Sequence, residues 1–420
     1  MRKVKILRSN LNCFITITVV LVVFTGGMSC SGTSEILKLA DTAQAAEELG
    51  RENPTVEANN QFGLQLFQQL YQTNKNLFIS PLSISIALTM TLNGAAGDTQ
   101  QEMKKTLALS DLDLETINSD FGNLQKSLQL TSSRIKLQIA NSLWGREDIV
   151  FGSDFLQTNR EYFDATLQSV NFKKQQSITD INQWVKDKTN GKIDRIVSQV
   201  EPETILFLIN AVYFKGNWTK AFNQKETTER KFFLIDGSQR TVDMMSQSGK
   251  YLTYTSSDFQ AVRLPYDNGR LGMYVLLPDS KHSLTDWVTE LTFANWKIWQ
   301  SQFIEREGDV VLPKFKVEYE KDLNNYLSAL GMKLAFVPNQ ADFSNICKNP
   351  SDLYIGGVKH KSYIEIAEEG TEAAAVTSVQ VRTTAIQPNR LYFVANRPFA
   401  FIIEDQWTGS ILFLGIVANP

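Results

Sequence analysis

The spacing of apolar and polar positions changes character along the 420-residue chain. In the first half, apolar residues recur mainly at helical spacing, whereas short runs typical of strands dominate from Lys231 onward. Helices are predicted over residues 59–72, 80–94, 111–130, 181–197 and 322–330, and the fourth of them is expected to end near Asn190-Gly191. Strands are predicted over residues 135–143, 204–214, 251–254, 260–264, 271–277, 309–317, 391–403 and 411–416. The pattern therefore predicts one mixed α+β body with helices early and sheet late.

One of these runs, residues 204–214, is apolar at nearly every position. A strand with one solvent-exposed face alternates apolar and polar side chains, whereas a strand that is covered on both faces does not. The run therefore predicts a strand in the interior of a large sheet.

A segment near the C-terminus, Glu368 to Ala385, has a different pattern. Every second residue is small and uncharged, namely Thr371, Ala373, Ala375, Thr377, Val379, Val381 and Thr383, while Glu372, Ser378, Gln380 and Arg382 lie between them. A period of two predicts a strand with one buried face, although the large residues of an ordinary core strand are missing. The alternative is a helix, which the short Glu-Ala-Ala-Ala run favours locally. We interpret the segment as a chain that can form a strand but need not.

Composition and charge are those of an ordinary globular protein, with 43% hydrophobic residues, 21% charged residues and a net charge of −3. This balance gives no reason to expect a nucleic-acid partner. The acidic helix predicted from Asp111 also lacks the basic stripe that binding of a sulfated polysaccharide requires.

The N-terminus resembles an export signal. Four basic residues precede an apolar run from Cys13 to Phe24, which is short for a membrane span. Small residues around Cys30 resemble a bacterial lipoprotein cleavage box, although Gly27 stands where that box prefers Leu. Three outcomes remain open: a lipid on Cys30, cleavage without a lipid, and an uncleaved anchor. We predict a signal peptide over residues 1–30 and a polar tether over residues 31–56.

This N-terminus predicts an exported protein, which is extracellular, periplasmic or a cell-envelope lipoprotein, and indicates a bacterial source. Contact with a membrane is expected only through a lipid on Cys30. Without the signal, the body keeps a single cysteine, Cys347, so no internal disulfide is expected.

Recognisable catalytic and metal-binding motifs are missing from the sequence. There is no Walker loop, dinucleotide fingerprint, His-Glu-x-x-His or Gly-x-Ser-x-Gly pattern. Only two histidines exist, His282 and His360, and neither lies near a recognisable nucleophile. The sequence therefore argues against an enzyme and predicts no metal and no cofactor.

Five longer motifs do match a known pattern. They are Asn76-Leu-Phe-Ile-Ser-Pro-Leu-Ser-Ile84, Asn210-Ala-Val-Tyr-Phe-Lys-Gly-Asn-Trp218, Leu312-Pro-Lys-Phe315, Glu368-Glu-Gly-Thr-Glu-Ala-Ala-Ala375 and Asn396-Arg-Pro-Phe-Ala-Phe401. In this order they resemble the serpins, a family of serine protease inhibitors. The resemblance implies a serpin domain over residues 57–420, with three β-sheets, about nine helices and an exposed reactive-centre loop at about residues 368–390.

The resemblance also implies a mechanism. The loop is bait for a target serine protease, which is trapped as a covalent acyl-enzyme while the cleaved loop inserts into the main sheet. The hinge of the loop matches Glu368, Glu369, Gly370, Thr371, Glu372, Ala373, Ala374 and Ala375. Glycine and small residues suit a hinge that must move and then enter a closing sheet. No catalysis by the inhibitor itself is implied, and a monomer is expected.

The length of the loop implies the position of cleavage. In inhibitory serpins the cleaved residue follows the hinge glycine by fourteen positions, which indicates the Thr384–Ala385 bond here. The segment after this bond resembles the corresponding part of antithrombin. Thr384 suits an elastase-like or subtilisin-like protease, and the alternative is cleavage after Arg382 by a trypsin-like enzyme.

Other residues match positions that control opening of the main sheet. Ser80, Ser83, Asn210 and His360 resemble a polar cluster beneath it, while Trp218 and Lys314 resemble residues at its opening end, with Lys314 as the partner of Glu368. The alternative function is a non-inhibitory serpin that serves as a carrier or storage protein. Such members often have charged, bulky or proline residues in the hinge, and the inward positions of this hinge have none.

Overall fold

The computed structural model describes residues 46, 49–50, 52–129, 134–201, 204–347, 353–370 and 390–420. The predicted signal, most of the predicted tether and residues 371–389 lie outside these ranges. Cys30, the hinge residues from Thr371 to Ala375, Arg382, Thr384 and Ala385 therefore lie outside the described residues.

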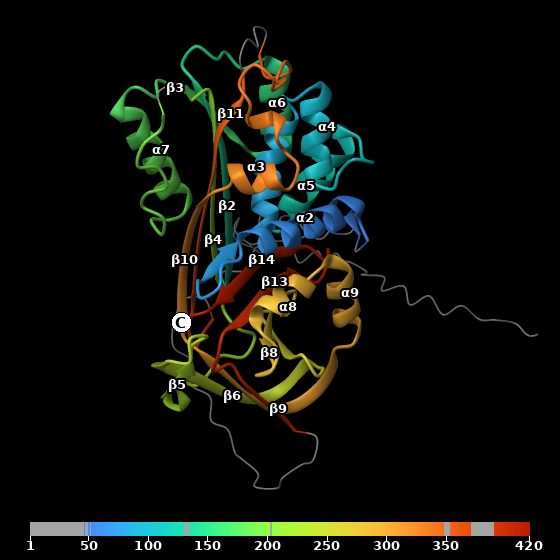
Figure 1. Ribbon diagram of the computed structural model, residues 1–420, viewed down its shortest axis with the longest axis vertical. Helices are drawn as coiled ribbons and strands as arrows, with labels where there is room; N and C mark the ends of the chain where they lie inside the picture. Colours follow the sequence, from blue (N-terminus) through green and yellow to red (C-terminus); the bar gives the residue numbers. More distant parts are fainter. Residues whose placement is uncertain are drawn as a thin grey trace, which may run out of the picture.

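Two sheets and their covering helices build the molecule (Figure 1). The helices are α2 (Pro54–Leu70), α3 (Pro81–Leu92), α4 (Gly97–Thr106), α5 (Leu114–Ser127), α6 (Ser153–Phe163), α7 (Gln175–Lys188), α8 (Leu284–Glu290), α9 (Phe293–Ser301) and α10 (Asn324–Ala329). The strands are β1 (Leu77–Ile79), β2 (Ile135–Arg146), β3 (Thr166–Val170), β4 (Leu206–Gly216), β5 (Thr228–Phe233), β6 (Gln239–Thr255), β7 (Phe259–Pro265), β8 (Leu271–Pro278), β9 (Ile304–Pro313), β10 (Phe315–Asp322), β11 (Ile355–Ile366), β12 (Leu391–Val394), β13 (Phe399–Asp405) and β14 (Ile411–Val417).

The five-stranded sheet has the order β10-β11-β4-β2-β3. Figure 1 shows it edge-on, with α7 on one face and α2 to α6 on the other. β4 is buried at all but one of its positions because both faces are covered. The interior strand predicted over residues 204–214 is thus confirmed to within two residues at each end.

The second sheet has nine strands because the 17-residue strand β6 is shared by two parts of it. β6 pairs first with β5, then with β9, and finally with β7 at its C-terminal end. Three sheets were expected. The structure shows two, because β6 joins what would otherwise be two separate sheets into the nine-stranded one. The α+β prediction is confirmed, with nine α-helices in the part of the chain that the structure describes.

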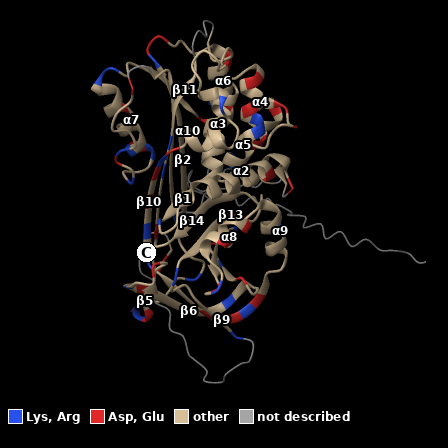
Figure 2. Ribbon diagram, in the orientation of Figure 1, with Lys and Arg blue, Asp and Glu red and all other residues tan. Residues whose placement is uncertain are grey.

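Charged residues of both signs lie close together on β5 and β9 of the second sheet, with acidic and basic positions alternating at the start of β9 (Figure 2). This mixture agrees with the small net charge of −3. It offers no extended basic strip for a polyanion on the strands seen in this view.

The first helix begins earlier than the apolar spacing predicts. Asn53 caps α2, because its side-chain oxygen accepts hydrogen bonds from the N–H groups of Thr55 and Val56 at 2.8 and 3.1 Å. Pro54 occupies the first helical turn, where its missing N–H is harmless. Thr55 and Val56 are buried, so residue 56, the predicted end of the tether, lies inside this helix.

The helix predicted over residues 181–197 begins earlier than expected, because α7 spans Gln175–Lys188. The outer bound at Val197 is wrong, but the predicted end near Asn190-Gly191 is confirmed. Asn190 and Gly191 have positive φ angles of 52° and 74°, which stop the helix. The apolar residues that follow, among them Ile193 and Val197, are buried in the same cluster as β4 residues on the α7 face of the sheet. Their spacing resembles a helix, but it arises from a connection that lies on a sheet.

Within the described ranges, no helix combines the length and the apolarity needed to cross a membrane. The same residues hold no cluster of His, Cys, Asp and Glu that could bind a metal ion. Cys347 is a buried free thiol.

Candidate functional site

The centre of the five-stranded sheet is a parallel contact between β4 and β11, which we call the β4–β11 seam. Its pairs run from Leu206 with Ile355 to Tyr213 with Tyr363. The flanking contacts, β11 with β10 and β4 with β2, are antiparallel. Parallel pairing is slightly less stable per residue than antiparallel pairing, so the seam is the weaker contact within the sheet interior.

Three polar side chains lie at one register on the neighbouring strands β2, β4 and β11. We call them the polar row. Asn141 on β2 pairs with Asn210 on β4, which pairs in turn with His360 on β11. Asn210 Nδ2 donates to Asn141 Oδ1 at 2.5 Å, and His360 Nδ1 lies 2.5 Å from Asn210 Oδ1. All three side chains are buried, so these bonds form where no solvent competes.

The start of α3 lies against the polar row. Asn210 Nδ2 donates to the backbone oxygen of Ser83 at 2.9 Å and also contacts Ser83 Oγ. Ser80 is one step removed, because its Oγ accepts from the Ser83 N–H at 3.3 Å as the N-cap of α3. Ser83, Asn210 and His360 are therefore in one hydrogen-bonded group, and Ser80 supports it.

His360 is neutral in this group. Burial lowers its pKa to about 3. The backbone oxygen of Ser83 can only accept, so the nitrogen of the Asn210 amide faces α3 and its oxygen faces His360. His360 must then donate from Nδ1, and its Nε2 is a buried acceptor without a partner among the described residues. Such a histidine has a structural role and is unsuited to proton transfer near neutral pH.

A second group of predicted residues lies where β11 ends. The Glu368 carboxylate accepts from Lys314 Nζ at 3.1 Å and from Thr227 Oγ1 at 2.8 Å. Burial by itself would raise the pKa of Glu368, but the hydrogen bonds from its own N–H, Thr227 and Lys314 outweigh burial and lower that pKa. Lys314 is 39% exposed, so its ion pair with Glu368 is weak. We call this ion pair the Glu368 clasp.

Trp218 packs at the same end of the seam, where β11 ends. Its ring stacks on Tyr266 with centroids 4.4 Å apart, and its Nε1 donates to the backbone oxygen of Ala367 at 3.1 Å. Its backbone N–H donates to the oxygen of Glu369 at 2.8 Å. The residue thus binds the chain after β11 to the end of β4 through both its ring and its backbone.

The chain turns back on itself between Ala367 and Gly370. The N–H of Ala367 donates to the oxygen of Gly370 at 2.7 Å, and the reverse bond is 3.1 Å long. Gly370 has a φ of 135°, and a Cβ there would lie 2.1 Å from the oxygen of Gly216. Gly370 already forms an antiparallel bridge with Asn217, just beyond the end of β4.

The structure therefore brings the predicted residues together in two groups at different points of one seam. Sequence reasoning missed two members, Asn141 and Thr227. Asn141 had a visible signal, because it is a polar residue at one of the alternate positions that are otherwise apolar in the strand predicted over residues 135–143. Thr227 had none, because it lies 141 residues from Glu368 in the chain.

Comparison with known proteins decides the family. A family model described as Serpin (serine protease inhibitor) matches residues 57–420. The chain belongs to the serpin family. Serpins are inhibitors of serine proteases and are generally not enzymes.

Known serpins resemble this one over most of its length. The human leukocyte elastase inhibitor is 36% identical over 86% of this chain and 98% of its own length. The crystal structure of tengpin, a thermophilic serpin in its native state, superimposes with a TM-score of 0.82 at 34% identity, over 88% of this chain and 95% of tengpin. Human thyroxine-binding globulin, crystallised with thyroxine, gives a TM-score of 0.80 at 28% identity, over 87% of this chain and 98% of the other. The expected serpin fold is thus confirmed.

Proposed function

We propose that this serpin inhibits an elastase-like or subtilisin-like serine protease as a suicide substrate. The protease attacks the Thr384–Ala385 bond and forms an acyl-enzyme, and the cleaved loop then enters the β4–β11 seam as a new strand. The inhibitor acts as a monomer, without a metal or cofactor. The observation that carries the proposal is the register in which the chain after β11 already meets the end of β4.

This register follows from two bridges of Gly370. Gly370 pairs antiparallel with Asn217 beyond β4 and with Ala367 beyond β11. Continued along β4, the register brings Thr371 level with Gly216, Thr377 with Asn210 and Val381 with Leu206. Continued along β11, it brings Thr377 level with His360, which is itself the partner of Asn210. The two edges of the seam thus agree on one register for an inserted strand.

The same register explains the small alternate residues. Asn210 points toward α3, and the side chains of Leu208, Val212 and Phe214 belong to the main core. Residues directly opposite each other in an antiparallel pair share a face. The odd-numbered residues from Thr371 to Val381 would therefore enter the core, where only small or apolar side chains fit, and the interleaved Glu372 and Arg382 would face the other side.

The energetic direction of insertion follows from the pairing. Insertion exchanges one parallel contact for two antiparallel contacts with a single new strand, and the strand spans the 11 residues of β4. Each hydrogen bond gained contributes about 0.5–1.5 kcal/mol net. The uninserted state is then held by a kinetic barrier, and the polar row and the Glu368 clasp are part of that barrier.

Cleavage at Thr384 leaves an inserted strand that covers all of β4 and extends three residues beyond Val381. Cleavage after Arg382 by a trypsin-like enzyme would shorten the strand by two residues, or roughly 6–7 Å. A shorter inserted strand displaces the bound protease less far, which favours release of the protease over trapping. We therefore propose cleavage at the Thr384–Ala385 bond.

A second candidate is a carrier or storage function, which the likeness to thyroxine-binding globulin raises. The small, uncharged inward positions of the hinge favour inhibition, because a carrier has no need of a segment that can enter a sheet. We further propose export through residues 1–30, with Cys30 as the candidate site of lipid attachment.

The decisive test is incubation with elastase-like, subtilisin-like and trypsin-like proteases, followed by denaturing gels and mass analysis of the released C-terminal peptide. We expect a denaturant-resistant complex with one of the first two enzymes and a peptide that begins at Ala385. A peptide that begins at Thr383 would show that cleavage occurs after Arg382. Cleavage by all of the enzymes without any complex contradicts inhibition.

Adjacent substitutions on opposite faces test the register. Thr371→Arg places a charge toward the core and should convert the inhibitor into a substrate that is cleaved without trapping. Glu372→Arg, its matched control, faces the other side beside Lys215 and should keep the stoichiometry of inhibition. Equal behaviour of the two variants would show that the proposed register is wrong.

A further inference from the structure

A buried carboxyl group, that of Glu404 near the end of β13, lies beneath α9. Glu404 is only 4% exposed, and its Oε2 accepts from Trp296 Nε1 at 3.0 Å and from Gln300 Nε2 at 2.6 Å. The ring of Trp296 also packs edge-on against Tyr274 of β8, with centroids 5.1 Å apart. Burial raises the pKa of Tyr274 to about 12, so this neighbour stays uncharged. Glu404 thus joins β13 to α9 through neutral donors alone.

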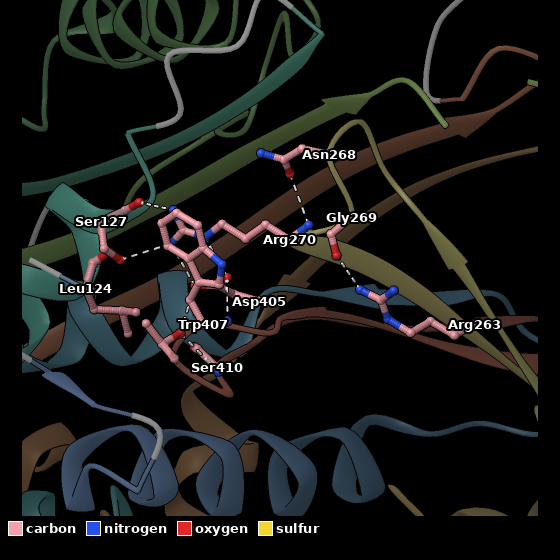
Figure 3. Close-up of polar contacts among 10 residues, drawn as sticks. Leu124, Ser127, Arg263, Asn268, Gly269, Arg270, Asp405, Trp407 and Ser410 are labelled. Carbon is pink, nitrogen blue, oxygen red and sulfur yellow. Dashed lines mark hydrogen bonds and ion pairs between the residues drawn. The ribbon is translucent and has the colours of Figure 1, made fainter. Parts of the chain in front are cut away.

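Arg263, on β7, contributes a positive charge to this cluster but forms no ion pair with Glu404 among the described residues. Its guanidinium lies over Gly272, the β8 residue that pairs with Glu404, where a Cβ would lie 2.5 Å from it. Nη2 donates to the backbone oxygen of Gly269 at 2.8 Å (Figure 3). With the Gln406 amide turned so that its oxygen faces the guanidinium, that oxygen accepts from Nε and Nη2 at 3.1 and 3.2 Å. Arg263 is therefore engaged by uncharged acceptors.

Other charged groups near Glu404 are paired elsewhere. Asp405, the next residue of β13, pairs with Arg270 at 2.7 Å. Successive side chains of a strand point to opposite faces, so this pair lies on the face of β13 away from α9. Lys297, on α9, pairs with Glu57 of α2 at 2.8 Å and is exposed. An ionised Glu404 would thus be a buried charge without a paired cation in the described part of the chain.

The environment of Glu404 favours its neutral form. Burial raises the pKa of this carboxyl from 4.5 to about 7, and the charge of Asp405 acts in the same direction. The hydrogen bonds from α9 and the charge of Arg263 lower the pKa, but burial outweighs them. Both hydrogen bonds go to Oε2, so Oε1 can take up a proton while both bonds remain. The side chain can therefore change its charge near neutral pH without leaving its site.

We propose that Glu404 is a proton-operated switch that controls how firmly α9 packs against β8 and β13. Below neutral pH the carboxyl is neutral, and α9 is held most firmly. As the pH rises, the carboxylate becomes a buried and uncompensated charge, which favours opening of α9 to admit water. The switch belongs to the second sheet rather than to the β4–β11 seam, so it does not rest on protease inhibition.

Hydrogen exchange of the α9 amides tests the switch in the whole protein. The closed state holds the proton more tightly than an opened state, so its protection is greatest at low pH and is lost as the pH rises through about 7. Between pH 6 and pH 8.5 the protection factor, corrected for intrinsic exchange, should fall about tenfold. Glu404→Gln imitates the neutral carboxyl and should remove this fall. A wild-type protection factor that does not change, or an equal fall in the variant, overturns the proposal.

Infrared spectroscopy identifies the group that titrates, because a neutral carboxyl has a carbonyl band that a carboxylate lacks. Burial also raises the pKa of Glu369, so the measurement uses a Glu369→Gln background. The band should be present at pH 6, should disappear with a midpoint near pH 7, and should be missing when Glu404→Gln is added. If Glu404→Gln does not fold, a background protein without a band that titrates near neutral pH still contradicts the assignment.

Two further variants separate the titration from simple packing. Gln300→Met removes a hydrogen bond to the carboxylate, so the midpoint should move to higher pH in both measurements. Glu57→Gln, the matched control, removes another carboxylate that contacts α9, at the exposed ion pair with Lys297. It should leave the midpoint and the tenfold fall unchanged. An unmoved midpoint in Gln300→Met, or a lost pH dependence in Glu57→Gln, would show that Glu404 is not the switch.

Discussion

Two regions of this serpin hold buried polar groups in opposite ways. At the junction of α5, β8 and β13, Arg270 Nε and Nη2 donate to the two carboxylate oxygens of Asp405 at 2.7 and 2.8 Å (Figure 3). Arg270 Nη1 donates to the backbone oxygen of Ser127 at 2.7 Å, and the ring of Trp407 covers its guanidinium at 4.2 Å. Both charges are almost fully buried, and both carboxylate oxygens and each of the three guanidinium nitrogens are engaged.

The β4–β11 seam is less complete. His360 Nε2 and Asn141 Nδ2 have no hydrogen-bond partner in the described part of the chain, and the ion pair at the end of the seam has one exposed member. The junction joins α5 to the second sheet through charged groups whose separation would be costly. The polar side chains of the seam are incompletely paired, which suits the opening that the proposed function requires.

The largest effect is expected at the junction. Arg270→Met leaves the Asp405 carboxylate buried without a cation and should lower the free energy of unfolding by about 3–5 kcal/mol, measured by urea denaturation. The double variant Arg270→Met/Asp405→Asn removes the stranded charge and should regain most of that loss. A loss under about 1 kcal/mol for the single variant would contradict the view that this junction is the tightly held region.

The next effect depends on pH and arises from His360. Its folded-state pKa is depressed to about 3 from an ordinary value of 6.5, so the unfolded chain binds the proton more readily. Its contribution to stability is thus present above pH 6.5 and is lost as pH falls toward 3, by on the order of a few kcal/mol. His360→Gln should flatten this decline in acid unfolding curves. A His360→Gln variant that keeps the wild-type decline would contradict this origin.

A smaller effect is expected at the turn after β11. Gly370→Ala brings a Cβ within 2.1 Å of the Gly216 oxygen, in a backbone conformation that is already unfavourable for alanine. The variant should lose about 1–3 kcal/mol and should displace residues 367–370 from Trp218, which tryptophan fluorescence can report. Gly237→Ala shares the positive φ but meets no atom within 4 Å, so it measures strain alone. Equal losses in both variants would show that no steric clash exists at Gly370.

The smallest effect is expected at the clasp. Lys314→Met should cost only about 0–1 kcal/mol of global stability, because the lysine is partly exposed, and 1 M salt should reduce the difference further. Under the proposed function, its clearer consequence is faster spontaneous loss of inhibitory capacity on warming. A cost near that of Arg270→Met would abolish the contrast between the two regions.

Much of the fold was predictable where local signals are strong. Ser80 and Pro81 predict the start of α3, because capping requires particular residue types. The apolar run over residues 204–214 predicts β4, because burial of both faces requires apolar side chains at nearly every position. Apolar spacing alone extends α7 to Val197, because Ile193 and Val197 owe their burial to a sheet that is distant in the chain. The Asn190-Gly191 pair, a local signal, indicates the end of this helix correctly.

The sequence by itself determined the α+β class, the serpin motifs, and a segment from Thr371 to Thr383 whose alternate residues suit the inside of a sheet. Only the tertiary structure decided that Asn141, Asn210 and His360 form one row, that Thr227 supports Glu368, and that Arg270 joins Asp405 to Ser127. The reason is physical: composition and periodicity are local properties of the chain, whereas hydrogen bonds across strands depend on register, and register is set when distant segments pack.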